Sequence, residues 1–222
     1  MSPQELSAAL PEAALAFRGY NVTNLGRSGE LLAHAAYGPT VERHLHAISQ
    51  AASQHLGRTV DLVSRVRGGV ETSIESYGDA IALIIGMECA QRELMEQHFG
   101  IKLRTAQFSF GYSLGEISAL IGGGAIEAAD ALRIPLSLAD DCVALAAEAT
   151  LGVLFTRATE LPLEDVREVC LRINAQGRGV IGISSHLAPN SVLLIGQHDT
   201  LDRFAELARG MTTERLHLRK NE

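Results

Sequence analysis

The chain of 222 residues lacks an excess of positive charge. It holds 19 lysines and arginines against 26 aspartates and glutamates, which gives a formal net charge of −7 at pH 7. A protein that binds nucleic acid needs a basic surface to neutralise phosphates, so this composition predicts no nucleic-acid partner. Acidic and basic residues are interspersed along the chain, and we interpret the net negative charge as a source of solubility.

Long hydrophobic runs are also missing. No apolar run approaches the roughly 20 residues that a bilayer crossing requires. The first eleven residues carry no basic stretch followed by an apolar core, so they do not form a signal peptide. The sequence therefore predicts no membrane partner and a cytoplasmic location. Hydrophobic residues make up 46% of the chain, enough for the core of one large domain or of a domain with a smaller insertion.

Cysteine is scarce, and histidine is scattered. Three cysteines at positions 89, 142 and 170 form neither a disulfide framework nor a metal motif, and their apolar or helical surroundings predict buried packing thiols. The eight histidines show no spacing typical of metal ligands. We therefore predict no metal site.

The first part of the chain, residues 1–149, shows the pattern of an α/β layer. Apolar runs predict strands at Ala13–Phe17 and Ala106–Phe110, and helical spacing covers Tyr37–Leu56 and Ser76–Phe99. Residues 125–149 are predicted to be helical with an interruption near Pro135. Gly100 is the expected stop of the long apolar helix before it.

The second part, residues 150–220, predicts a different unit. Its expected elements are, in order, a strand (Gly152–Thr156), a helix (Pro162–Ile173), two strands (Gly179–Ser185 and Ser191–Gly196), a helix (Asp199–Ala208) and a strand (Glu214–Leu218). This βαββαβ order is that of a ferredoxin-like subdomain.

The most informative motif is the Gly-x-Ser-x-Gly at residues 111–115, with Ser113 at its centre. It follows a predicted strand and precedes a predicted helix, which is the setting of a nucleophile elbow. In such a turn the serine hydroxyl lies beside backbone N–H groups at a helix N-terminus, where developing negative charge is stabilised. The glycine triplet at residues 122–124 ends the following helix, and because no Lys–Ser/Thr pair follows it, a phosphate-binding loop is disfavoured.

The residues around this serine resemble a known family. Residues 111–120 read Gly-Tyr-Ser-Leu-Gly-Glu-Ile-Ser-Ala-Leu, similar to the Gly-His-Ser-Leu-Gly-Glu-Tyr-Ser-Ala-Leu signature of malonyl-CoA:acyl-carrier-protein transacylases and of the acyltransferase domains of fatty-acid and polyketide synthases. Phe17–Arg18–Gly19 resembles the start of that family's Phe-Pro-Gly-Gln-Gly loop. The resemblance implies an α/β-hydrolase-like core with an inserted ferredoxin-like subdomain.

The resemblance also implies a function. A serine takes an acyl group from a coenzyme A thioester, holds it as an ester, and passes it to the pantetheine thiol of an acyl carrier protein. Acyl-CoA is then a substrate and the acyl carrier protein a partner, with no permanently bound cofactor. By resemblance Ser113 is the nucleophile, and the backbone N–H groups of Leu114 and Tyr20 form the oxyanion hole.

The sequence departs from the family pattern at substrate-binding positions. Tyr112 replaces the histidine before the serine, and we expect it to reshape the mouth of the pocket. Leu138 stands where malonyl-using members place an arginine that pairs with the free carboxylate of the substrate. Burying that carboxylate against leucine costs several kcal/mol. An acetyl or longer uncharged acyl group is the better fit, unless Arg133 or Arg18 compensates.

The family's general-base histidine has no counterpart in these residues. His217 alternates with leucines within a predicted strand, and we interpret it as a strand residue. A serine without a base is a weak nucleophile at neutral pH. We therefore predict that the chain is an N-terminal portion of a longer acyltransferase, that its core is incomplete, and that these 222 residues alone are inactive. Two alternatives remain: an esterase or thioesterase on the same elbow, and a non-catalytic module that binds the carrier protein.

Overall fold

The structure is a computed structural model that describes residues 1–209 and 216–220. The chain divides into two compact units, residues 1–143 (unit 1) and residues 144–222 (unit 2), each with its own hydrophobic core. The predicted domain boundary at residues 149 and 150 falls at the start of the first strand of unit 2. The chain is thus a mixed α/β protein with two separate sheets, as the sequence predicted.

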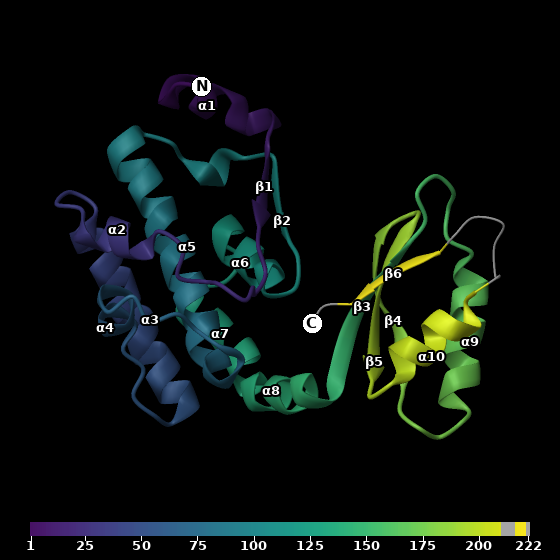
Figure 1. Ribbon diagram of the computed structural model, residues 1–222. Helices are drawn as coiled ribbons and strands as arrows, with labels where there is room; N and C mark the ends of the chain where they lie inside the picture. The colour runs from purple at the N-terminus through teal and green to yellow at the C-terminus, as the bar shows by residue number, and fades with distance from the viewer. Residues whose placement is uncertain (210–215, 221–222) are drawn as a thin grey trace. The chain divides into compact units, whose positions relative to one another are not determined.

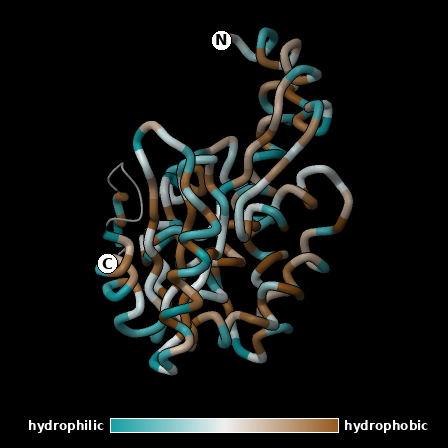
Figure 2. The backbone as a smooth tube through the Cα atoms, turned by 90° about the vertical axis from the view of Figure 1, so that its right-hand side faces the viewer, coloured by the Kyte–Doolittle hydropathy of each residue, from teal (hydrophilic) through white to brown (hydrophobic). Residues whose placement is uncertain are grey.

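Unit 1 is mostly helical and holds one short sheet (Figure 1). Its elements are α1 (Pro3–Ala9), the 3-10 helix η1 (Leu10–Glu12), β1 (Ala14–Phe17), α2 (Ser28–Ala33), α3 (Gly38–Leu56), α4 (Leu62–Arg67), η2 (Ile74–Ser76), α5 (Tyr77–Phe99), η3 (Leu103–Thr105), β2 (Phe108–Gly111), α6 (Leu114–Gly123) and α7 (Ala128–Ser137). Helix α8 (Ala139–Glu148) continues into unit 2. Helix α1 lies at the end of unit 1 where β1 begins, as Figures 1 and 2 show.

Helix α5 is the centre of the unit 1 core. Every residue from Gly78 to Met87 is buried, and all of them are apolar except Asp79, whose carboxylate pairs with Arg58 and Arg65. Helices α3, α4, α6 and α7 contact it. It ends at Gly100, whose left-handed φ of 68° lets its amide donate to the carbonyl of Glu96. The predicted helix and its glycine stop are confirmed.

The sheet of unit 1 brings the two predicted strands together. Strands β1 and β2 pair in parallel, with Ala14 opposite Phe108 and Phe17 opposite Gly111. Helix α6 packs against both strands. Because the strands are parallel, their carboxyl ends meet at one edge, where β2 leads into Ser113 and β1 leads into the loop that begins with Arg18.

Unit 2 has the predicted order of elements. These are β3 (Ala149–Phe155), α9 (Leu163–Asn174), β4 (Ile181–Ala188), β5 (Ser191–Gln197), α10 (Thr200–Leu207) and β6 (His217–Lys220). The strands form one sheet in the order β4-β5-β3-β6, and all neighbours are antiparallel. Helices α9 and α10 contact each other and this sheet, and the fully buried Phe204 belongs to their shared core. This is the arrangement of a split βαβ unit.

The structure differs from the sequence-based prediction in the region of residues 125–149. The interruption was predicted near Pro135, but α7 passes through Pro135 and ends at Ser137, with Leu138 as its C-cap. Ala149 was predicted to be helical but opens β3, where it pairs with Gln197. Strand pairing therefore outweighs the helical pattern at this position.

Some elements were missed, and one prediction falls partly outside the described residues. Helices α2 and α4 have six residues each and are too short to show a clear period. Helix α1 begins with a capping box between Ser2 and Glu5 that we did not recognise. For the predicted strand at residues 214–218, Glu214 and Arg215 lie outside the described residues, and β6 starts at His217. No described helix is both long and apolar enough to cross a membrane.

The three cysteines do not share one environment. Cys89 and Cys170 are buried as predicted, but Cys142 is exposed, so the prediction was wrong there. Helix α8, which carries Cys142, buries only Ala139. Burial raises the pKa of the Cys170 thiol to about 11.

Alkylation should separate these thiols. At pH 8 a thiol with a pKa of about 11 is almost entirely protonated, and protonated thiols react slowly. We expect iodoacetamide to modify Cys142 at least tenfold faster than Cys89 or Cys170 in the folded protein, as measured by peptide mass spectrometry. In urea all three rates should converge. Equal rates without urea would contradict the burial described above.

Candidate active site

The strongest candidate site is the turn between β2 and α6. Ser113 stands there with φ 56° and ψ −123°. Among the described residues only Ser113 and His198 combine a side chain with a positive φ. Such a backbone costs roughly 1–3 kcal/mol and persists only where the surroundings enforce it, often at functional sites. The Ser113 side chain is exposed and so is open to a substrate.

The glycines on both sides of Ser113 are required by backbone contacts. A Cβ on Gly111 would lie 1.9 Å from the carbonyl carbon and oxygen of Gly115, and a Cβ on Gly115 would lie 2.3 Å from the carbonyl oxygen of Phe17. No side chain fits at these separations. The motif is therefore a packing requirement of a sharp strand-to-helix turn, which is the geometry of a nucleophile elbow.

The loop after β1 lies directly against this turn. The amide of Tyr112 donates to the carbonyl of Phe17. A Cβ on Gly19 would be 2.8 Å from the carbonyl oxygen of Tyr112, 3.2 Å from Cβ of Ser113 and 3.8 Å from the amide nitrogen of Leu114. The segment that resembles the family's N-terminal loop is thus in contact with the candidate nucleophile.

The backbone amides at the start of α6 differ in whether they have a hydrogen-bond acceptor. The amide of Gly115 donates to the carbonyl of Tyr112, and that of Glu116 donates to the carbonyl of Ser113, both at 2.9 Å. Leu114 is the first residue of α6, and among the described hydrogen bonds its amide has no acceptor. A free amide at a helix N-terminus is suited to hold a developing oxyanion.

Tyr20 follows Gly19, so its backbone is close to the elbow while its ring is held elsewhere. The ring is half-buried and packs edge-to-face on Tyr77, with centroids 5.0 Å apart. Burial raises the pKa of the Tyr20 hydroxyl, and the carboxylates of Glu75 and Glu71 raise it further. The neutral, packed ring of Tyr20 anchors the loop. A tyrosine at this position is therefore compatible with the predicted role of its backbone N–H in an oxyanion hole.

The predicted substrate-binding residues are spread over the surface of unit 1. Tyr112 is 52% exposed beside Ser113, and Leu138 is 51% exposed where α7 ends. No described contact joins Leu138 to Ser113. Arg18 donates to the carbonyls of Thr23 and Asn24, which ties it to its own loop, and Arg133 is exposed.

The histidines of the described residues form other contacts. His217 lies in β6 and stacks on Phe155, as its alternation with leucines predicted. His44 is 2.7 Å from the carboxylate of Glu93. No described contact of a histidine involves Ser113, and no three metal-ligating side chains of the described residues cluster.

One polar residue near the site was not recognised from the sequence. Glu88 interrupts the buried apolar face of α5, and burial raises the pKa of its carboxyl. The nearby Ser118 hydroxyl and the charge of Arg18 oppose that shift. Oε2 of Glu88 and Oγ of Ser118 are nevertheless buried, and neither has a hydrogen-bond partner of good geometry within the described part of the chain. An acid between two buried apolar residues of a helix, here between Met87 and Cys89, is the signal that marks such a residue.

Comparison with known proteins identifies the fold. No protein-family model matches the chain, and no curated protein matches it. Solved structures do match. The malonyl CoA-acyl carrier protein transacylase of Coxiella burnetii has a TM-score of 0.67 at 20% identity, over 94% of this chain and 60% of that one. The chain has the acyltransferase fold.

Two further structures with this fold show the same relation. The acyl-carrier-protein S-malonyltransferase of Burkholderia pseudomallei matches with a TM-score of 0.61 at 22% identity, over 89% of this chain and 59% of that one. The acyltransferase domain from module 8 of the salinomycin polyketide synthase matches with a TM-score of 0.66 at 21% identity, over 95% of this chain and 46% of that one. The chain therefore spans about 60% of the length of the transacylases that it matches. The resemblance drawn from the elbow motif is confirmed for the fold.

Relief of backbone strain at Ser113 is measurable. Glycine adopts a positive φ without the steric cost of a Cβ, so Ser113→Gly should stabilise unit 1 by roughly 1 kcal/mol relative to Ser113→Ala. All four tyrosines (Tyr20, Tyr37, Tyr77 and Tyr112) lie in unit 1, so tyrosine fluorescence in urea follows its unfolding. The exposed helical Ser137 is the control, because Ser137→Gly should be neutral or destabilising. A less stable Ser113→Gly protein would show that the turn is not strained.

Proposed function

We propose that the protein is an acyltransferase that moves an acyl group from coenzyme A to an acyl carrier protein through an ester on Ser113. The observation that carries this proposal is the strained, exposed Ser113 between Gly111 and Gly115, in a chain with the acyltransferase fold. A serine held in that way presents its hydroxyl at the carboxyl edge of a parallel sheet, next to a free helix-terminal amide.

The proposed chemistry has two symmetrical halves. Oγ of Ser113 attacks the thioester carbonyl, the carbon–sulfur bond breaks, and coenzyme A leaves as the thiol after taking a proton. The pantetheine thiol of the carrier protein then attacks the ester, the carbon–oxygen bond breaks, and Ser113 regains its proton. In both halves the backbone N–H groups of Leu114 and Tyr20 stabilise the tetrahedral oxyanion.

Proton transfer needs a base that the contacts of Ser113 do not provide. We propose that a histidine outside residues 1–222 supplies it, and that these residues alone turn over little substrate. This proposal is supported by the described contacts of His44 and His217, which involve Glu93 and Phe155 and not Ser113. A serine hydroxyl without a base loses most of its reactivity at neutral pH.

The proposed architecture has two parts. Residues 1–149 act as an α/β-hydrolase-like core that carries Ser113, and residues 150–220 act as an inserted ferredoxin-like subdomain. The proposed partners are the acyl carrier protein and acyl-CoA, with no membrane or nucleic acid involved, and the proposed location is the cytoplasm. The absence of a charged partner at Leu138 favours an uncharged acyl group over malonyl.

One alternative function rests on a specific observation. The lack of a described base near Ser113 also suits a non-catalytic module that binds the carrier protein. Such a module would bind the carrier protein equally well with Ser113→Ala and would never form an acyl ester. An esterase on the same elbow would release acid from simple esters without transfer to any carrier.

Acyl-enzyme formation tests the proposal. Residues 1–222 are incubated with radiolabelled acetyl-CoA, alone and with the separately expressed part of the Coxiella burnetii transacylase that this chain does not match. We expect labelling near background for the chain alone and at least a tenfold increase with the added part, because we propose that the missing base lies in that part. Mass spectrometry locates the ester on the peptide that contains Ser113.

Two variants control this measurement. Ser113→Ala should abolish the label, whereas Ser137→Ala, at an exposed helical serine, should leave it unchanged. Label that survives Ser113→Ala, or no label in a mixture in which the two polypeptides demonstrably bind, would refute the acyltransferase assignment.

The acyl preference has its own test. Introducing a guanidinium with Leu138→Arg should raise the ratio of malonyl to acetyl labelling by about tenfold, since a charged hydrogen bond to a partly exposed carboxylate contributes on the order of 1.4 kcal/mol. Ile134→Arg, at a residue of α7 that is 55% exposed, tests for a general effect of added charge. If both variants change the ratio equally, Leu138 does not contact the substrate.

A further inference from the structure

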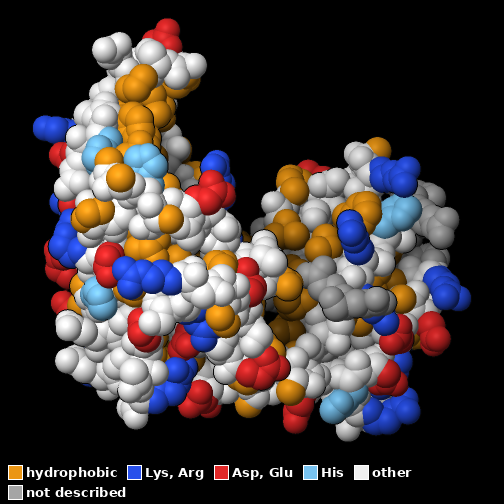
Figure 3. Space-filling model, turned by 60° about the vertical axis from the view of Figure 1, so that its left-hand side comes forward, with side chains coloured by type: hydrophobic (Ala, Val, Ile, Leu, Met, Phe, Trp, Pro, Cys, Tyr) orange, Lys and Arg blue, Asp and Glu red, His pale blue; other side chains and the backbone are white. Residues whose placement is uncertain are grey.

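Glu71 differs from other surface carboxylates of unit 1 in the groups that it binds. Acidic and basic side chains lie next to each other on the surface of this unit (Figure 3), and Glu30 and Glu42 each pair with an arginine. Glu71 is exposed as well, but none of the described salt bridges includes it. Its carboxylate accepts hydrogen bonds from three backbone N–H groups instead. Such bonds to an ionised acceptor are stronger than those between neutral groups.

Two of these amides belong to the loop after β1, residues 18–27. Oε1 of Glu71 lies 2.9 Å from the amide nitrogen of Asn24 and 3.1 Å from that of Leu25, although these residues are 47 and 46 positions earlier in the chain. The buried Asn24 side chain also donates from Nδ2 to the hydroxyl of Thr72, at 3.0 Å. Burial alone would raise the pKa of the Glu71 carboxyl, but the bonds from Asn24, Thr72 and Leu25 together lower it. The loop therefore favours the charged carboxylate.

Glu71 is itself fixed to the core of unit 1. One terminal nitrogen of Arg65 donates to the carbonyl of Glu71 at 3.1 Å, and the other pairs with the carboxylate of Asp79 at 2.8 Å. Asp79 is buried in the first turn of α5. The loop after β1 is thus connected through Glu71 and Arg65 to the central helix of the unit.

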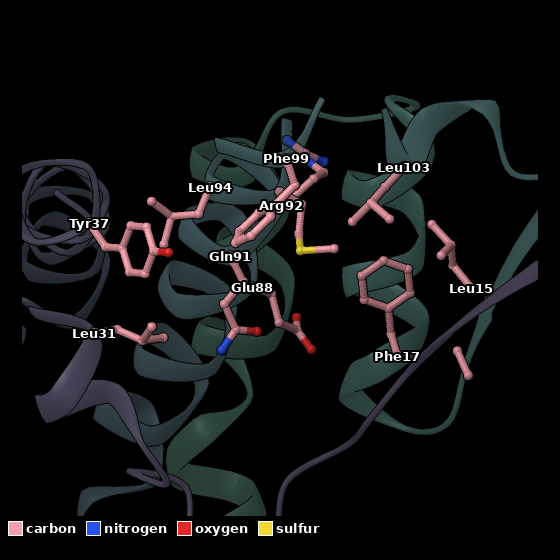
Figure 4. A pocket seen from close by; sticks show the side chains of 12 residues that line it. Leu15, Phe17, Leu31, Tyr37, Glu88, Gln91, Arg92, Leu94, Phe99 and Leu103 are labelled. Carbon is pink, nitrogen blue, oxygen red and sulfur yellow. The ribbon is translucent and has the colours of Figure 1, made fainter. Parts of the chain in front are cut away.

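The opposite end of the loop is fixed by different contacts. Phe17, the last residue of β1, turns its ring toward α5 (Figure 4). That ring also packs on α6, where a Cβ on Gly122 would lie 2.4 Å from it. Between the two fixed ends come Gly19, which contacts the elbow, and then Tyr20. The position of the Tyr20 backbone N–H therefore depends on both ends of the loop.

We propose that Glu71 is a positioning residue for acyl transfer: its carboxylate holds the loop after β1 so that the Tyr20 N–H reaches the oxyanion formed on Ser113. The role rests on the proposed function, because Glu71 acts only through the oxyanion hole. The oxyanion exists in the transition state and not in bound acyl-CoA. A displaced loop therefore slows acylation without weakening the binding of acyl-CoA.

The rate of acylation tests this role. Residues 1–222 are mixed with radiolabelled acetyl-CoA and the unmatched part of the Coxiella burnetii transacylase, as for the proposed function. Loss of one oxyanion donor lowers kcat by roughly a hundredfold or more. We expect Glu71→Ala, which misplaces a donor, to slow the labelling of Ser113 at saturating acetyl-CoA at least tenfold. The half-saturating concentration and the final amount of label should not change. Glu71→Gln keeps one acceptor oxygen and should stay within threefold of the original rate.

Glu75→Ala is the matched control for the loss of charge. Glu75 is exposed, lies four residues after Glu71, and also places its charge near the Tyr20 hydroxyl. Its carboxylate is hydrogen-bonded to Ser73 in its own turn, and no described hydrogen bond joins it to the loop after β1. The labelling rate of Glu75→Ala should stay within twofold of the original.

Variants of Tyr20 separate positioning from a general structural role. Tyr20→Pro lacks the backbone donor, whereas Tyr20→Ala keeps it and loses only the ring. Adding Glu71→Ala to Tyr20→Pro should cost less than a further twofold in rate, because the donor that Glu71 positions is already gone. Adding it to Tyr20→Ala should cost the full tenfold. A purely structural role would cost the same on both backgrounds.

Two further measurements cover the possibility of unfolding. Tyrosine fluorescence in urea reports whether unit 1 of each variant is folded, and hydrogen exchange at Asn24 and Leu25 should be at least tenfold faster in folded Glu71→Ala. If Glu71→Ala does not fold, Thr72→Val takes its place. That change keeps nearly the same shape, removes the hydroxyl that binds Asn24, and should slow labelling at least threefold.

Three results would overturn the proposal alone. The first is labelling at the original rate in folded Glu71→Ala, or in Thr72→Val where that variant replaces it. The second is an equal loss of rate in Glu71→Ala and Glu75→Ala. The third is a full tenfold loss when Glu71→Ala is added to Tyr20→Pro. A mixture of the original chain that never labels Ser113 would refute the proposed function, and the role of Glu71 with it.

Discussion

The close approach of three backbone segments at the elbow is the constraint on which the rest of unit 1 depends. Gly111, Gly115 and Gly19 each bring a bare Cα against a neighbouring carbonyl, at separations that no Cβ tolerates. This packing joins the end of β2, the start of α6 and the loop after β1 into one rigid corner. The positive φ of Ser113 follows from it, since the chain must turn sharply between a strand and a helix that touch. The position of the Ser113 hydroxyl is thus set by main-chain geometry.

A buried platform supports this corner. Helix α5 packs against other helices and places two polar side chains, Glu88 and Arg92, on the side that faces Phe17 and α6. Helix α6 packs across both strands and carries Ser118, whose hydroxyl is buried near that carboxyl. Burying the Glu88 carboxyl and the Ser118 hydroxyl costs free energy of folding. Their presence below the elbow therefore indicates a structural or functional requirement for polar groups there.

The parts of this fold that the sequence predicts well are those with a local physical cause. The buried run from Gly78 to Met87 is apolar apart from Asp79, and the helix that contains it ends at Gly100, so α5 was predicted to within one residue. The elbow could be predicted because a sharp turn between a strand and a helix leaves no room for a Cβ at Gly111 and Gly115. The end of the helical stretch at Ala149 was wrong because strand pairing with Gln197 is a distant contact that no window of sequence contains. Exposure of Cys142 was missed for the same reason: which side of α8 is covered depends on neighbours, not on its own pattern.

The candidate site lies at one edge of the sheet of unit 1. Ser113 follows the carboxyl end of β2, at the edge where functional groups from neighbouring parallel strands normally converge, and within the described residues this sheet has two strands. The described residues bring the Ser113 turn, the start of α6 and the loop after β1 to this edge, and no described histidine contact involves Ser113. Because main-chain packing alone sets the position of that serine, the turn keeps its geometry without any contact from a base.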